Sequence, residues 1–131
     1  MKIEDRRKHK RYKILVDTRV ITPETTMSGI ADEISGDGIR ILSKKAIESG
    51  IDVIVSIKIK DEILLHGTVI WAIEFRDDTM HGYKIGIQTY AIVYKDIKAI
   101  GFPKKSELLQ EILTFLKEQG ETVTEVSSDS F

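Results

Sequence analysis

Cysteine is absent from this sequence, which excludes disulfide bonds, thiolate metal sites and cysteine nucleophiles. No segment approaches 18 uncharged apolar residues, so neither a membrane-spanning helix nor membrane insertion is expected. The start of the chain is charged from Lys2 onward and lacks the apolar stretch of a secretory signal, so we expect a cytoplasmic protein. The net charge is only −1 over 131 residues, and 41% of them are hydrophobic. This composition predicts one soluble domain with a sizeable core.

Alternating hydrophobic and polar residues dominate the chain and predict half-buried antiparallel strands. The clearest runs cover residues 12–20, 53–59, 63–75 and 83–90. A weaker pattern within residues 25–43 adds two short strands. Six short strands with tight turns favour a small six-stranded antiparallel β-barrel over a sandwich, because a closed sheet has no exposed edges.

Beyond residue 103 the hydrophobic period changes to three and four residues, as in an amphipathic helix. The expected stripe consists of Leu108, Leu109, Ile112, Leu113, Phe115 and Leu116. Ser106 is the expected N-cap, and Gly120 stands where a glycine commonly follows a helix. The stripe favours packing of the helix on the barrel. Pairing with a second chain is the alternative, so the oligomeric state stays open.

These patterns divide the chain into four parts. A flexible basic arm is expected at residues 1–12, the barrel at residues 12–103 and the helix at residues 104–119. Residues 120–131 are polar and aperiodic, so a disordered tail is predicted there.

The basic arm contains the run Arg6-Arg7-Lys8-His9-Lys10-Arg11. Residues 1–13 hold seven Lys or Arg against two acidic residues, so the rest of the chain is net acidic. Such a run is often a solvated terminus, and it can also hold nucleic-acid phosphates. The chain has no basic stripe on a strand, no helix-turn-helix and no RNA-recognition signature, so weak nucleic-acid binding through the arm is only a minor alternative.

A second candidate site is the segment Glu33-Ile34-Ser35-Gly36-Asp37-Gly38. In an extended strand Glu33 and Ser35 project to one face, while Ile34 points to the core. The two glycines around Asp37 predict a tight turn with positive φ angles. The segment is either an ordinary turn or a polar site whose glycines let another molecule approach the backbone.

Together, the arm and the turn resemble the PilZ domain, a bacterial receptor module for cyclic di-GMP. The resemblance depends on an Arg-x-x-x-Arg pattern followed by an acidic-x-Ser-x-x-Gly pattern. Their residues are Arg7, Arg11, Glu33, Ser35 and Gly38. Further similarities are six strands, Trp71 in the fifth strand, a Tyr-x-x-Gly-Ile sequence at residues 83–87 and a closing helix. The resemblance covers roughly residues 5–118.

The resemblance implies a PilZ-like split barrel with a cyclic di-GMP site. The implied ligand-binding residues are Arg6, Arg7, Arg11, Glu33, Ser35 and Gly38. The planar fork of an arginine can hydrogen-bond a guanine edge, bind phosphate or stack on a purine. Ser35 is implied to hydrogen-bond the ligand, the acidic residue to accept from a guanine N–H, and Gly38 to keep the turn open.

Glu33 departs from the family pattern, which usually has Asp or Asn at this position. The longer side chain displaces its acceptor by about one methylene, enough to weaken a well-placed hydrogen bond. Adjacent Asp32 is expected to face the opposite way unless a bulge intervenes. Because of Glu33, a protein-interaction adaptor that does not bind nucleotide is the main alternative.

Catalysis is not predicted. The three histidines, His9, His66 and His81, are scattered without carboxylates at metal-ligand spacing, so no metal site is expected. Asp77 and Asp78 indicate a solvated loop, and Ser35 has no Gly-x-Ser-x-Gly context. We therefore predict a receptor without enzymatic activity or cofactor. Its arm closes over cyclic di-GMP, and a downstream protein, not identified by the sequence, recognises the new surface.

Overall fold

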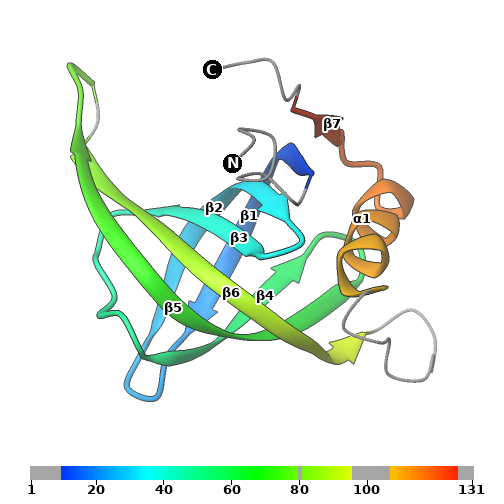
Figure 1. Cartoon of the computed structure of the whole chain (residues 1–131), viewed down its shortest axis with the longest axis horizontal. Helices are drawn as coiled ribbons and strands as arrows, with labels where there is room; N and C mark the ends of the chain where they lie inside the picture. Colours follow the sequence, from blue (N-terminus) through cyan, green and yellow to red (C-terminus); the bar gives the residue numbers. More distant parts are fainter. Residues whose placement is uncertain (1–9, 80, 96–106, 127–131) are drawn as a thin grey trace, which may run out of the picture.

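The computed structural model describes residues 10–79, 81–95 and 107–126. Six strands are followed by one helix and a short final strand (Figure 1). In chain order they are β1 (Arg11–Ile21), β2 (Thr26–Ser35), β3 (Gly38–Ser43), β4 (Asp52–Lys58), β5 (Glu62–Arg76), β6 (His81–Lys95), α1 (Leu108–Glu118) and β7 (Thr124–Glu125). The predicted fold class, antiparallel β with a C-terminal helix, is confirmed.

The strands form one sheet that closes into a ring. Its order is β2-β3-β6-β5-β4-β1-β7, and β2 also pairs with β1. The β1–β2 pairing extends from Arg11↔Ser35 to Ile21↔Thr26. By contrast, β1 and β4 pair only from Arg19↔Ser56 to Ile21↔Ile54. The six-strand arrangement predicted from the sequence is therefore present, with a narrow seam between β1 and β4.

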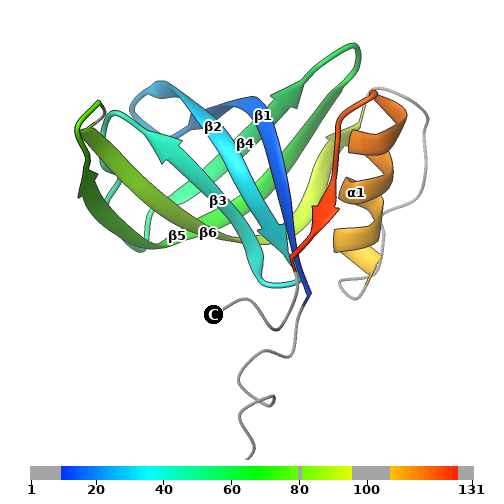
Figure 2. The same cartoon turned by 90° about the horizontal axis from the view of Figure 1, so that it is seen from above.

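The core lies inside the ring and is built mainly from isoleucine and valine. In β1, buried Ile14, Val16 and Val20 alternate with exposed residues, as the sequence pattern predicts. The helix α1 contributes its stripe to the same core through Leu108, Ile112, Leu113, Phe115 and Leu116. The predicted packing of the helix on the sheet is confirmed. Figure 2 shows α1 standing beside the ring, next to β7.

The C-terminal end of α1 is fixed by backbone and side-chain hydrogen bonds. Gly120 has φ +87° and donates from its N–H to Lys117 O at 3.0 Å, while Glu121 N donates to Leu116 O at 3.0 Å. This is a Schellman motif, and the predicted C-terminal glycine is confirmed. Ser106, the predicted N-cap, lies outside the described residues.

Gln119 joins the end of the helix to the β4–β5 turn. Its buried side chain accepts hydrogen bonds from Lys60 N and Asp61 N, both at 2.8 Å. Its Nε2 donates to Asp61 Oδ2 at 2.9 Å. One side chain therefore satisfies two backbone donors of a turn almost 60 residues earlier in the chain.

The structure differs from the predicted disordered tail at residues 121–126. Strand β7 pairs with β1 through Tyr12↔Glu125 and Lys13↔Thr124, and Val126 N donates to Arg11 O at 2.8 Å. The edge of β1 supplies backbone partners that a polar, aperiodic sequence does not reveal. Residues 127–131 of the predicted tail lie outside the described residues.

Strands β5 and β6 are each 15 residues long and form a hairpin that extends past the ring (Figure 1). Register irregularities occur at Leu64/Leu65, His66/Gly67 and Val69/Trp71, which allow the hairpin to coil around the ring. Strand β6 continues beyond the predicted residue 90 because its pairing with β5 persists to Ile63↔Lys95. Within the described ranges, α1 is the only helix, and it is not long and apolar enough to span a membrane.

Candidate ligand-binding site

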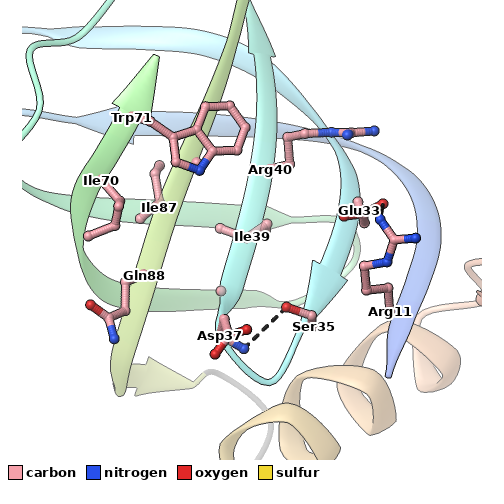
Figure 3. A pocket seen from close by; sticks show the side chains of 12 residues that line it. Arg11, Glu33, Ser35, Asp37, Ile39, Arg40, Ile70, Trp71, Ile87 and Gln88 are labelled. Atoms are coloured by element: carbon pink, nitrogen blue, oxygen red, sulfur yellow. Dashed lines mark hydrogen bonds and ion pairs between the residues drawn. The ribbon is translucent and has the colours of Figure 1, made fainter. Parts of the chain in front are cut away.

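A pocket of about 490 Å³ lies where β1 begins and the β2–β3 turn ends. Its lining residues come from β1, β2, β3, β5 and β6, and Figure 3 shows how their side chains lie around it. Its lining residues are Arg11, Glu33, Ser35, Asp37, Gly38, Ile39, Arg40, Ile70, Trp71, Gly86, Ile87 and Gln88. Four predicted site residues, Arg11, Glu33, Ser35 and Gly38, are thus brought together. The other two, Arg6 and Arg7, lie outside the described residues.

Arg11 and Glu33 face each other across the β1–β2 pair. Arg11 is directly opposite Ser35, and Lys13 is opposite Glu33. The contact between Arg11 Nη1 and Glu33 Oε1 is 3.5 Å, longer than a well-formed charged hydrogen bond. Arg11 Nε is buried and has no hydrogen-bond partner in the part of the chain that the structure describes. Because the guanidinium has five N–H donors and makes only this one long contact among the described residues, Arg11 retains donor capacity for a ligand.

Asp32 occupies a bulge in β2, between the pairs Ala31↔Ile41 and Glu33↔Arg40. Both Asp32 and Glu33 are half-buried, whereas Ala31 and Ile34 on either side are buried. The simple alternation, which placed Asp32 on the opposite face, does not hold here. The bulge removes both carboxylates from the core.

The bulge lets Asp32 bind Arg40, a residue that the sequence did not single out. Arg40 Nε donates to Asp32 Oδ1 at 2.8 Å, and Arg40 Nη2 donates to Asp32 Oδ2 at 2.9 Å. These hydrogen bonds raise the pKa of Arg40 above its ordinary value, so the guanidinium stays charged. A bidentate pair also fixes the plane of the fork. Arg40 is therefore a positioned cation in the wall of the pocket.

The β2–β3 turn forms the lower wall of the pocket in Figure 3. Asp37 N donates a hydrogen bond to Ser35 Oγ at 3.1 Å, which holds the turn closed. The Ser35 hydroxyl keeps its own proton as a donor for a ligand.

Gly38 is needed for space and not for its φ angle. Among the described residues only Gly50 and Gly120 have positive φ, so the predicted positive φ angles at Gly36 and Gly38 are wrong. A Cβ on Gly38 would collide with the backbone oxygen of Ile87 on β6. The glycine therefore lets β3 approach β6 at the mouth of the pocket.

The opposite wall is apolar and comes from the β5–β6 hairpin. The bulge between Val69 and Trp71 turns Ile70 and Trp71 outward, where they are 49% and 39% exposed. The Trp71 indole covers Gly86, since a Cβ there would collide with the ring. The sequence marked Trp71 only as a family feature, because its place in a wall depends on this bulge.

Charges within the described part of the pocket balance. Among the lining residues, Arg11 and Arg40 are matched by Glu33 and Asp37, and Asp32, which pairs with Arg40, is a third carboxylate outside the lining. An anionic ligand therefore needs further positive charge from outside the lining residues. No group of three or more His, Asp or Glu side chains suited to a metal ion occurs among the residues placed in the structure.

A sequence model of the PilZ domain family matches residues 5–98. The chain belongs to the PilZ family. This match includes the whole Arg-x-x-x-Arg pattern and the complete Glu33–Gly38 segment. Helix α1 and strand β7 of this PilZ chain lie beyond the matched residues.

Two solved structures are similar in fold to this PilZ chain. The PilZ domain with c-di-GMP of YcgR from Escherichia coli has a TM-score of 0.62 at 13% identity, covering 88% of this chain and 94% of that chain. The Bacillus subtilis inhibitor of motility (MotI/DgrA) has a TM-score of 0.56 at 19% identity, covering 86% of this chain and 52% of MotI. Identities this low establish only the fold. No curated protein sequence matches the chain significantly.

Proposed function

We propose that this PilZ chain is a receptor for cyclic di-GMP and acts as an adaptor without catalytic activity. The observation that carries the proposal is the meeting of Arg11, Glu33 and Ser35 in one pocket at the base of the basic arm. These residues come from the two motifs by which the sequence resembles its family. The family match over residues 5–98 supports the same ligand.

The walls of the pocket complement the parts of this nucleotide. Each guanine offers an O6/N7 acceptor edge that suits an arginine fork, and the single long contact of Arg11 with Glu33 leaves it donors for that edge. The Glu33 carboxylate is an acceptor for a guanine N–H, and the Ser35 hydroxyl is a donor for a phosphate oxygen. Ile70 and Trp71 present an apolar surface on which a purine face packs.

The basic arm supplies the charge that the pocket lacks. Cyclic di-GMP carries two phosphodiester charges, whereas the described lining is balanced between two arginines and two carboxylates. We therefore assign phosphate binding mainly to Arg6 and Arg7. Movement of this arm on binding changes the surface around β1, and a partner protein recognises that change.

The test is calorimetric titration with cyclic di-GMP. The wild type is expected to bind, and Arg11→Ala to lose at least about 2 kcal/mol of binding free energy, or roughly thirtyfold in affinity. Arg19→Ala is the matched control, because Arg19 is an exposed arginine on the same strand outside the pocket lining. Absence of heat from the wild type at high micromolar nucleotide, with no change in melting temperature, would refute the proposal.

The contact between Arg11 and Glu33 favours one alternative, a PilZ adaptor that binds proteins but no nucleotide. In such an adaptor Glu33 would neutralise Arg11 permanently. The two functions differ in the phenotype of Glu33→Ala. A receptor would change its nucleotide affinity, whereas an adaptor would show no nucleotide binding with either residue at this position.

A further inference from the structure

A second pocket, of about 560 Å³, lies between the β1–β2 hairpin and the far end of the β5–β6 hairpin. It shares no lining residue with the pocket around Arg11. Figure 1 shows the two hairpins projecting from the ring in different directions. The groove between them plays no part in the proposed nucleotide site.

One side of this groove is an open strand edge. Strand β2 pairs with β1 down to Thr26, but its pairing with β3 begins only at Ile30↔Leu42. In the described chain, residues 26–29 therefore have a strand neighbour on one side only. All four of these residues line the groove. An open edge of this kind accepts an added strand through backbone hydrogen bonds.

The groove also offers an apolar surface beside that edge. Ile30, Leu42 and Phe75 contribute hydrophobic side chains from β2, β3 and β5, whereas Met27 packs against the core on the other face of β2. Ile30 and Leu42 are register partners, so their side chains lie next to each other on one face. Alternate side chains of an added strand would rest on this surface.

The rim of the groove is predominantly basic. Lys44 and Lys45 are exposed where β3 ends, and Lys84 Nζ lies 5.8 Å from the centre of the Phe75 ring. Asp17 is the one carboxylate among the lining residues. The charge of the rim therefore favours a segment that carries carboxylates between its hydrophobic residues.

We propose that this groove docks an extended segment of a partner protein, with alternating hydrophobic and acidic residues, as a strand added to the edge of β2. The open edge of β2 pairs with an extended backbone, and the apolar surface contacts the hydrophobic side chains on one face of that segment. The lysines favour acidic side chains in it. The proposal does not depend on nucleotide binding, because no nucleotide-site residue takes part in it.

The test uses the full chain labelled with ¹⁵N and an eight-residue peptide of alternating valine and glutamate. Saturable amide shifts are expected at residues 26–29 and 42–45. A peptide with lysine in place of glutamate should bind about tenfold more weakly, as expected for two lost ion pairs. A valine–glutamate peptide with N-methylated alternate amides should fail to bind, because it cannot form the strand ladder.

Charge reversal provides the matched variants. Lys44→Glu combined with Lys45→Glu should reverse the preference to the lysine peptide, while Lys58→Glu combined with Lys60→Glu, another exposed pair, should leave it unchanged. Three outcomes would overturn the proposal: no saturable shifts at residues 26–29, equal binding of the N-methylated peptide, or groove shifts produced by decanoate and not by the peptide. The N-methylated peptide tests the wild type directly, so the proposal stays testable even if a lysine variant does not fold.

Discussion

At the scale of single residues, two arginines in the pocket are held in different ways. Arg40 makes two short hydrogen bonds to Asp32, whereas Arg11 makes one 3.5 Å contact with Glu33 and has a buried Nε without a described partner. Arg40 is thus fixed before a ligand arrives, and Arg11 can exchange its carboxylate for a ligand. Selectivity for the nucleotide is expected to depend on both, but ligand affinity on Arg11 above all.

Shortening Glu33 tests this division. Glu33→Asp keeps the acceptor but withdraws it from Arg11, so cyclic di-GMP affinity should rise by about 1 kcal/mol, or roughly fivefold. Calorimetric titration measures the change, and Glu24→Asp in the β1–β2 turn is the control. Unchanged or weaker binding would show that the Arg11–Glu33 contact does not compete with the ligand.

Gly38 gives a second prediction at this scale. Gly38→Ala places a methyl group against the Ile87 backbone oxygen, so unfolding free energy should fall by about 2–4 kcal/mol. Gly50→Ala is the contrasting variant, because Gly50 has φ +91° but open space around it. It should cost only about 1 kcal/mol. Urea denaturation distinguishes the two, and equal losses would contradict the steric explanation.

At the scale of elements, α1 depends on the sheet as much as on its own sequence. An isolated helix of 11 residues is marginal in water, and α1 gains stability by burying its stripe and by the hydrogen bonds of Gln119. The helix therefore links the β4–β5 turn to the hydrophobic core.

Gln119→Ala removes the side-chain hydrogen bonds between the end of α1 and the β4–β5 turn. Two backbone donors in the turn lose their acceptor, so unfolding free energy should fall by about 2–3 kcal/mol. Gln110→Ala on the exposed side of α1 should change it by no more than about 0.5 kcal/mol. Thermal unfolding followed by circular dichroism compares them. Similar melting temperatures for the two variants would mean that the turn finds other partners.

At the scale of the whole molecule, β7 ties the end of the described chain to the base of the basic arm. It pairs with Tyr12 and Lys13, and Lys10 Nζ lies 3.8 Å from Glu125 Oε2. The start of β1 is thereby placed between β2 and β7, directly beside the candidate pocket.

Truncation before Thr124 should loosen the start of β1 without unfolding the ring. Hydrogen exchange at residues 10–13 should accelerate about tenfold, while exchange in β3 and β5 stays unchanged. Truncation after Val126 retains β7 and is the control. Unchanged exchange at residues 10–13 in the shorter chain would show that β7 adds nothing to the order of β1.

Much of this molecule could be predicted from its sequence, because the period of the hydrophobic residues specifies strands and helix directly. The six strands and the helix stripe belong to this class. Gly120 followed from the residues that commonly end helices, and the meeting of Arg11 with Glu33 and Ser35 followed from the motifs of the family resemblance. The features that could not be predicted depend on the register of the strands. The bulges at Asp32 and Ile70 decide that Asp32 reaches Arg40 and that Trp71 lines the pocket, and an alternating pattern does not reveal an inserted residue.

The outward direction of Arg40 could nevertheless have been predicted from the sequence. Arg40 lies between Ile39 and Ile41, two inward-facing residues, so its outward direction follows from the strand pattern. Strand β7 could not have been predicted, because its two exposed polar residues pair only through their backbone. Backbone pairing of this kind depends on a free edge nearby, which only the folded chain defines.

The β7–β1 pair also makes the protein suitable as an optical sensor. The chain has no cysteine, so Thr124→Cys would introduce a single thiol for a fluorescent label. Thr124 is exposed and lies opposite Lys13, two residues from Arg11 in the candidate pocket. A dye at this position would report directly on whatever the arm and the pocket bind, with no second label and no competing site of attachment.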